Sequence, residues 1–235
     1  MKKNVVIKIG GSLLFSEDGN IDTEKIREFC TIIKNKDSYD SVIVVCGGGI
    51  LARQYIKALR KFNMNETICD LMGIGISRLN SKLLVANLKD FAYPQVPTSI
   101  EELSVALNFK KIIVMGGIQP GQSTTSVALE VAEYNNAKNV IVLTNVKGIY
   151  DKDPNKYTDA KLYNTLTIKQ LQDMLLDSFG DNQASAGEYR IFDAVSLQIL
   201  KRSKIEVIVI NGQDLQEFKK FWNGEKGVIG TVISS

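Results

Sequence analysis

Residues 5–12, VVIKIGGS, are a short β-branched run that ends in two glycines and a serine. Such a run is typical of a strand that is buried on both faces of a parallel sheet. Residues 42–49 (VIVVCGGG) and 112–117 (IIVMGG) repeat this arrangement. Because the carboxyl ends of parallel strands meet at one edge of a sheet, we expect the three glycine clusters to form a ligand-binding rim there.

The rest of the chain alternates strand and helix patterns. Further β-branched runs occupy residues 140–143 and 207–210, and apolar residues recur at helical spacing in residues 26–33, 51–62, 71–88 and 192–199. This alternation predicts an α/β fold. A segment rich in small and polar residues, 180–187, predicts a mobile loop. No linker or repeat marks a clean domain boundary, and at this length one large domain or two small ones are both possible.

The chain has 29 Lys and Arg against 26 Asp and Glu, a net charge of +3, and it contains no histidine. The missing histidine excludes Ser-His-Asp and Cys-His nucleophile systems and every zinc site that needs a histidine ligand. A charge of +3 is smaller than a dedicated nucleic-acid binder needs, so we expect no nucleic-acid partner. Anionic small molecules are the partners that this composition favours.

Cys30, Cys46 and Cys69 are odd in number and share no C-x-x-C spacing. They therefore predict neither a disulfide framework nor a metal site, and they favour a reducing cytoplasmic location. No run of 18 apolar residues occurs, so we expect no contact with a membrane.

Two cations lie close to the glycine clusters. Lys8 is inside the first strand, where a charge is costly unless it meets an anion at the strand end. Arg53 follows the second cluster, where its guanidinium can clamp a phosphate. Glycine N–H groups and helix N-termini favour phosphate at the same edge. A solvated edge-strand lysine and a solvated helix-face arginine remain the alternatives.

Two familiar phosphate-binding motifs are absent. Residues 116–123 come close to G-x-x-x-x-G-K-[ST], but Gln122 stands where that motif requires lysine. No cluster spells G-x-G-x-x-G either. The sequence therefore predicts neither a P-loop nor a dinucleotide fingerprint.

Taken together, the motifs resemble the amino acid kinase superfamily and, within it, the archaeal type of uridylate (UMP) kinase. The resemblance implies a single domain over residues 1–235, a three-layer α/β/α sandwich around a mainly parallel sheet. It also implies transfer of the γ-phosphoryl group of ATP to UMP with Mg²⁺, in pyrimidine nucleotide (CTP) biosynthesis. It also implies a homohexamer. The matching runs are 7–12 (IKIGGS), 47–53 (GGGILAR), 70–73 (DLMG), 116–124 (GGIQPGQST), 144–154 (TNVKGIYDKDP) and 202–210 (RSKIEVIVI).

The resemblance also assigns site residues, with UMP mainly on the N-terminal part and ATP mainly on the C-terminal part. It implies that Lys8 and Arg53 are catalytic cations. It also implies that no protein side chain holds a metal ion, because Mg²⁺ is bound by the nucleotide phosphates. The residues implied for ATP are Gly11, Ser12, Gly49, Arg53, Thr144, Asn145, Tyr150 and Asp153. Those implied for UMP are Gly48, Asp70, Ile118, Gln119, Pro120, Gly121, Gln122, Ser123 and Thr124.

Several positions depart from the family pattern or have a simpler reading. Lys147, Thr125 and Ala194 stand where relatives usually carry Asp, Asp and Pro. Asp193 and Ser123 are typical helix caps, whatever else they do. The enzymatic alternative is isopentenyl phosphate kinase, a family that uses a histidine absent here, and the non-enzymatic one is a nucleotide-binding protein without turnover.

Overall fold

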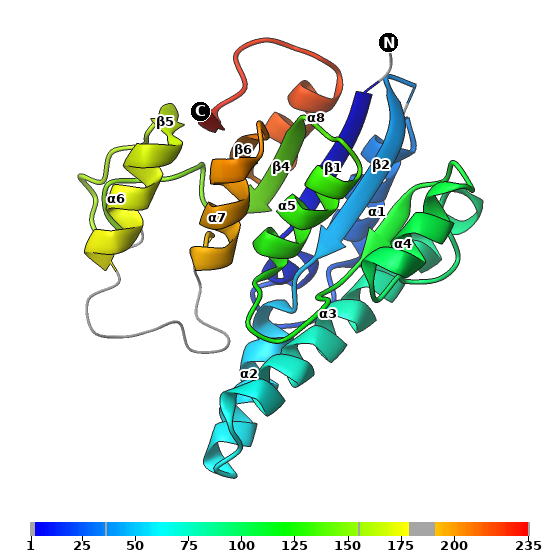
Figure 1. Cartoon of the computed structure of the whole chain (residues 1–235), viewed down its shortest axis with the longest axis horizontal. Helices are drawn as coiled ribbons and strands as arrows, with labels where there is room; N and C mark the ends of the chain where they lie inside the picture. The colour runs from blue at the N-terminus through cyan, green and yellow to red at the C-terminus, as the bar shows by residue number, and fades with distance from the viewer. Residues whose placement is uncertain (1–2, 36, 155, 179–190, 235) are drawn as a thin grey trace.

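A computed structural model describes residues 3–35, 37–154, 156–178 and 191–234. Within these residues seven strands form one sheet, in the order β3-β2-β1-β4-β6-β7-β5 (Figure 1). All neighbours pair in parallel except β6 and β7, which are antiparallel. The strands are β1 (Lys3–Ile9), β2 (Tyr39–Cys46), β3 (Ile113–Met115), β4 (Asn139–Thr144), β5 (Thr165–Thr167), β6 (Glu206–Asn211) and β7 (Gly230–Ser234).

The predicted α/β fold with a mainly parallel sheet is confirmed, and all five predicted strands form. The buried run of β2 shows why, since Val42, Ile43, Val44, Val45 and Cys46 are all inaccessible to solvent. Such strands can be stable only when both faces are covered. The two remaining strands, β5 and β7, are short and partly exposed. Their sequences therefore lack the continuous apolar run that predicts the other five.

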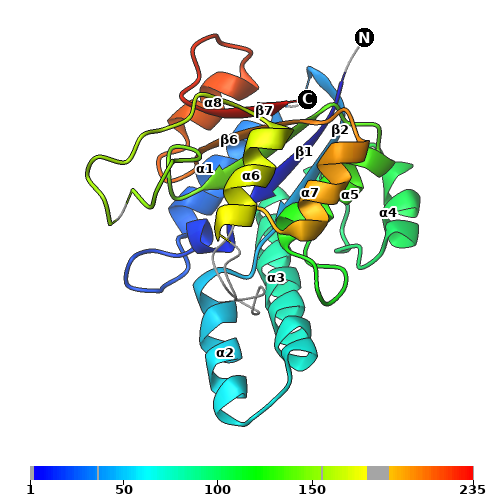
Figure 2. The ribbon, with the colours of Figure 1, turned by 60° about the vertical axis from the view of Figure 1, so that its left-hand side comes forward.

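Helices cover both faces of the sheet and make the three predicted layers (Figures 1 and 2). Apolar side chains of α1, α3 and α8 join the core on one face, and those of α4, α5, α6 and α7 join the core on the other. The helices are α1 (Thr23–Lys34), α2 (Gly49–Lys61), α3 (Glu66–Leu88), α4 (Ile100–Leu107), α5 (Thr124–Tyr134), α6 (Ile168–Ser178), α7 (Ala194–Arg202) and α8 (Gln216–Trp222).

Side chains cap the starts of α1, α5 and α7, and the caps at Ser123 and Asp193 were expected from the sequence. Asp22 accepts a hydrogen bond from the Lys25 N–H at the start of α1, and Ser123 accepts one from the Ser126 N–H at the start of α5. Asp193 begins α7 in a capping box with Ser196. Each cap satisfies an N–H that the helix itself leaves unpaired. The predicted loop 180–187 lies outside the described residues.

The strand order reverses between β1 and β4, because the chain runs from β1 outward to β3 on one side and from β4 outward to β6 on the other. Ligands bind in the crevice that such a reversal opens at the carboxyl ends of the strands. The Gly10 N–H donates to the Leu143 carbonyl across this point at 3.0 Å. From the same edge, α2 and α3 project away from the sheet as a helical hairpin (Figure 2). None of the described helices combines the length and apolar character needed to cross a membrane.

Candidate active site at the carboxyl edge of the sheet

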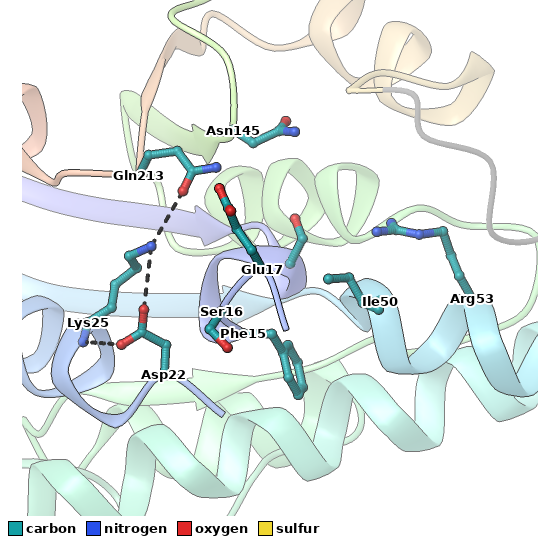
Figure 3. Close-up of a pocket in the computed structure, with 10 residues that line it drawn as sticks. Phe15, Ser16, Glu17, Asp22, Lys25, Ile50, Arg53, Asn145 and Gln213 are labelled. Atoms are coloured by element: carbon teal, nitrogen blue, oxygen red, sulfur yellow. Dashed lines mark hydrogen bonds and ion pairs between the residues drawn. The ribbon is translucent and has the colours of Figure 1, made fainter. Parts of the chain in front are cut away.

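A cavity of about 520 Å³ opens at the point where the strand order reverses (Figure 3). Ser12 reaches it from the loop after β1, Arg53 from the first turns of α2, and Asn145 from the loop after β4. Three residues that the resemblance assigns to ATP therefore line one space. Its remaining lining residues are Phe15, Ser16, Glu17, Asp22, Lys25, Ile50 and Gln213.

Those remaining residues were not predicted from the sequence. Lys25 illustrates the reason, because its ammonium contacts Gln213 at 3.4 Å, and Gln213 is 188 positions away along the chain. Figure 3 shows the Glu17 carboxylate ending on the side of the cavity where Gln213 lies, again from a distant segment. Only the folded topology brings α1, the loop after β1 and the loop after β6 to the same place. A single charged residue in a loop belongs to no local sequence pattern, so the sequence does not show that it will line the cavity.

The first two glycine loops touch through their backbones. A side-chain carbon built on Gly11 would overlap the Gly47 carbonyl and the Gly49 N–H. Gly49 also has a φ of +66°, a left-handed conformation that residues with a side chain rarely adopt. The loops after β1 and β2 are therefore pressed together, so the first two of the three predicted glycine clusters form one surface.

Lys8 is the penultimate residue of β1 and is half-buried. Side chains alternate across a strand, so Lys8 lies on the α5 side of the sheet with its strand neighbours Val45 and Val142. Among the described residues it has no hydrogen-bond or ion-pair partner. Burial lowers its pKa from 10.5 to about 8, although the charge of the Cys46 thiolate would raise it. A cation held in this way is poised to receive an anion.

Other residues assigned to ATP lie close by but not in the cavity lining. Thr144 is buried at the end of β4, and its hydroxyl contacts the Asn145 side chain at 3.4 Å. Tyr150 forms an isolated bridge with Leu162, and the Asp153 carbonyl accepts hydrogen bonds within a turn. The sequence already suggested a turn at this last position.

The residues assigned to UMP form a second group beside the second glycine loop. Asp70 of α3 accepts a hydrogen bond from the Gly121 N–H at 2.8 Å, although the two residues are 51 positions apart. A side-chain carbon on Gly47 would lie 3.4 Å from the Thr124 hydroxyl, which brings this loop against the start of α5. One oxygen of Asp70 thus holds the loop 118–124 in place.

Asp193 fastens the other end of that loop. Its carboxylate accepts hydrogen bonds from the Ser123 N–H at 2.8 Å, the Ser126 hydroxyl at 2.5 Å and the Ser196 N–H at 2.7 Å. Burial alone would raise the pKa of Asp193, but these hydrogen bonds outweigh it and lower the pKa below the usual value. The carboxylate stays ionised and ties the starts of α5 and α7 together. The predicted capping role is confirmed, and the link to α5 is additional.

The residues that depart from the family pattern do not take part in the hydrogen bonds by which Asp70 and Asp193 hold the loop 118–124. Lys147 is exposed on the loop after β4, whereas Thr125 is buried in the first turn of α5. Among the described residues, no group of three or more Cys, Asp or Glu side chains is arranged to hold a metal ion. The cavity lining holds the cations Lys25 and Arg53 together with the carboxylates Glu17 and Asp22, and Lys8 lies at the same edge of the sheet.

Comparison with known proteins gives a consistent result. A model of the amino acid kinase family matches residues 3–211. The uridylate kinase of Methanobrevibacter smithii is 40% identical over 231 residues, which cover 98% of this chain and 99% of that protein. The uridylate kinase of Sulfolobus acidocaldarius is also 40% identical, over 97% of this chain and 98% of that protein.

Solved structures agree with the sequence relatives. The crystal structure of uridylate kinase from Archaeoglobus fulgidus superposes with a TM-score of 0.81 at 37% identity, and it covers 98% of this chain and 100% of that chain. The UMP kinase of Ureaplasma parvum, at 22% identity and a TM-score of 0.80 over 100% of both chains, shares the fold.

Proposed function

Because this chain belongs to the amino acid kinase family and is similar over nearly its whole length to uridylate kinases, we propose that it transfers the γ-phosphoryl group of ATP to UMP. It is an ATP-dependent nucleoside monophosphate kinase. The products are UDP and ADP, and UDP leads toward CTP in pyrimidine nucleotide synthesis. The observation that carries the proposal is Lys8, a half-buried cation without an ion-pair partner among the described residues, at the edge where the glycine loops meet.

The chemistry needs no histidine. In the reaction an oxygen of the UMP phosphate forms a bond to the γ-phosphorus while the bond from that phosphorus to the β–γ bridging oxygen breaks. The acceptor oxygen is already ionised, so no general base is required. The protein must align the two nucleotides and neutralise charge on the transferred group. Lys8 and Arg53 supply fixed positive charge, and the N–H groups of the glycine loops supply oriented donors.

The two groups of residues divide the substrates between them. We assign ATP to the cavity side, with Gly11, Ser12, Gly49, Arg53, Thr144 and Asn145 near its phosphates, and Tyr150 and Asp153 toward its nucleoside. We assign UMP to Gly48, Asp70 and residues 118–124. The cavity supports the first assignment, and the Asp70–Gly121 hydrogen bond supports the second. In this proposal the cavity that takes ATP is lined mainly by residues of the N-terminal part, and Asn145 and Gln213 come to it from the C-terminal part.

Mg²⁺ enters this scheme with ATP. Bound to nucleotide phosphates, the ion supplies additional positive charge to the transferred group. The residues present fit that arrangement, because Arg53, Lys25 and Lys8 lie at this edge and would hold the phosphate oxygens to which the ion is bound. Glu17 and Asn145 both line the cavity, and their oxygen atoms would receive the water shell of the ion.

We also propose a homohexamer in the cytoplasm. The α2–α3 hairpin carries exposed apolar side chains that a second copy of the chain would cover, with Phe62 68% exposed and Leu79 53% exposed. Isolated apolar residues are ordinary on a protein surface, but a group of them on one projecting element marks an interface. Phe62, Met64, Ile68, Leu71 and Leu79 make up this group. Three free cysteines agree with a reducing compartment.

The oligomer can be tested by mass. Light scattering during gel filtration should give six times 26.0 kDa for the wild-type chain. Phe62→Asp with Leu79→Asp should give a smaller species, because two charges would be buried in the interface. A wild-type monomer would refute the assembly.

The substrate is tested by a coupled assay of ADP release with UMP, CMP, dTMP, AMP and isopentenyl phosphate. We expect UMP to give the highest kcat/KM by at least about tenfold, because residues 118–124 and Asp70 are held in place for one acceptor. A preference for isopentenyl phosphate would favour the enzymatic alternative. Nucleotide binding without ADP release would favour the non-catalytic one.

A further inference from the structure

The middle of α3 carries four polar side chains in a helix that is otherwise mostly apolar. Ser77, Asn80 and Ser81 are buried, and Arg78 is half-buried. Burying polar groups is unfavourable unless each finds a hydrogen-bond partner. All four find partners on the backbones of the second and third glycine loops or of the segments beside them. We call these four residues the polar segment of α3.

Arg78 makes the most extensive of these contacts. Its guanidinium donates from Nε to the Gly117 carbonyl at 3.0 Å, and from Nη2 to the Ile118 carbonyl at 3.1 Å and the Thr98 carbonyl at 3.3 Å. Among the described residues, no carboxylate pairs with it. The planar fork therefore fixes three carbonyl groups at once, which a lysine ammonium cannot reproduce in the same geometry.

The two serines hold the same stretch of chain. The Ser77 hydroxyl accepts from the Gly117 N–H at 2.7 Å, and the Ser81 hydroxyl donates to the Met115 carbonyl at 2.8 Å. Together with Arg78 they fix the backbone from Met115 to Ile118, where the loop assigned to UMP begins. Glycine is required at 116 because a side-chain carbon there would lie 2.7 Å from the Arg78 N–H.

Asn80 extends the polar segment to the second glycine loop. Its side-chain amide donates to the Gly47 carbonyl at 2.9 Å and to the Gly48 carbonyl at 3.2 Å. One helix thus holds the loop after β2 and the loop after β3. Because the first of these loops also touches the loop after β1, the spacing of the whole rim depends on α3.

We propose that Arg78 is a positioning residue for the phosphoryl acceptor, acting through the backbone of residues 117 and 118. This inference rests on the proposed function, since it assumes that residues 118–124 receive UMP. Arg78 sets where the acceptor loop leaves the sheet, and Asp70, two turns earlier on the same helix, holds the loop at Gly121. Loss of Arg78 releases the loop without removing any group that touches ATP.

The test compares Arg78→Met and Arg78→Lys with Arg202→Lys. Arg202 forms a forked ion pair with Glu133 on the surface, so it controls for the loss of a planar guanidinium elsewhere. We expect Arg78→Met to raise KM for UMP about tenfold with KM for ATP nearly unchanged. Arg78→Lys should lie between the wild type and Arg78→Met, and Arg202→Lys should match the wild type.

Hydrogen exchange without substrate gives a second readout. Amides of residues 116–119 and 121 should exchange about tenfold faster in Arg78→Met than in the wild type, while amides of β4 keep their protection. An equal rise in both KM values, or unchanged exchange in the loop, would overturn the proposal. If Arg78→Met does not fold, Arg78→Lys is judged by the same criteria.

The two proposals fail separately. A wild-type enzyme that prefers another acceptor overturns the assignment of UMP, and Arg78 is then judged by hydrogen exchange and by KM for the preferred acceptor. A wild-type enzyme that prefers UMP, with Arg78→Met kinetically normal, overturns only the role of Arg78.

Discussion

Lys8→Ala is expected to lower kcat about a thousandfold while KM for UMP changes by about twofold or less. Lys8 is a half-buried cation at the end of β1, beside the loops that would carry both nucleotides. Positive charge at this place matters most when negative charge accumulates on the transferred phosphoryl group. Single-turnover and steady-state rates at saturating ATP and UMP measure the effect.

Lys3→Ala is the matched control, because Lys3 lies on the same strand but is exposed at its far end. It should keep the wild-type kcat. A Lys8→Ala enzyme with normal kcat and a greatly raised KM for UMP would show instead that Lys8 only binds the substrate. Equal losses in Lys3→Ala would point to damage to the strand.

The pH dependence provides a second measurement of the same residue. Burial lowers the pKa of Lys8 to about 8, so the protonated form that attracts phosphate is lost as the pH rises through that value. We expect kcat/KM for ATP to decline above pH 8. The decline in kcat should occur at higher pH, because bound phosphates favour the charged form. Lys8→Ala should lack this decline, and an identical decline in that variant would assign it to another group.

Gly11→Ala is expected to reduce kcat/KM more than about a hundredfold and to lower the free energy of unfolding by about 3 kcal/mol. The new methyl group would overlap the Gly47 carbonyl and the Gly49 N–H, which are backbone atoms with little room to move. Separating the two loops would misplace the N–H groups that face the phosphates. Steady-state kinetics and urea unfolding measure the two effects.

Gly224→Ala is the control for Gly11→Ala. Gly224 follows α8, it does not line the cavity, and no atom lies within 4 Å of a side-chain carbon built on it. Alanine there should keep activity and lower the free energy of unfolding by about 1 kcal/mol, because the φ of +75° is unfavourable for a residue with a side chain. Wild-type activity in Gly11→Ala would mean that the contact between the loops is not needed for catalysis.

Much of the fold follows from local patterns. Uninterrupted β-branched runs identify buried strands, and glycine directly after such a run identifies the edge where ligands bind. Lys8 stands out because a charge inside such a run needs a reason. The sequence does not reveal β5 and β7, since their few residues are partly exposed.

The candidate site is only partly visible in the sequence because its contacts join distant segments. Lys25 and Gln213 meet in the cavity from α1 and from the loop after β6. Arg78 and Asn80 read as a surface arginine and a polar interruption of an apolar helix until their carbonyl partners are known. Register along the sheet and the crossing of α3 decide these pairings, and neither is a local property.

With 23 residues, α3 is long enough to act as a rigid rod between the hairpin tip and the glycine loops. At 1.5 Å per residue it is about 35 Å long, and a rigid tilt of one degree displaces its far end by about 0.6 Å. One end lies in the projecting hairpin, and the middle holds two of the three loops. A displacement of the hairpin tip would therefore be carried along α3 to the loops. In the proposed hexamer the neighbouring copy that covers the hairpin would in this way help to fix the spacing of the loops, although it does not enter the cavity.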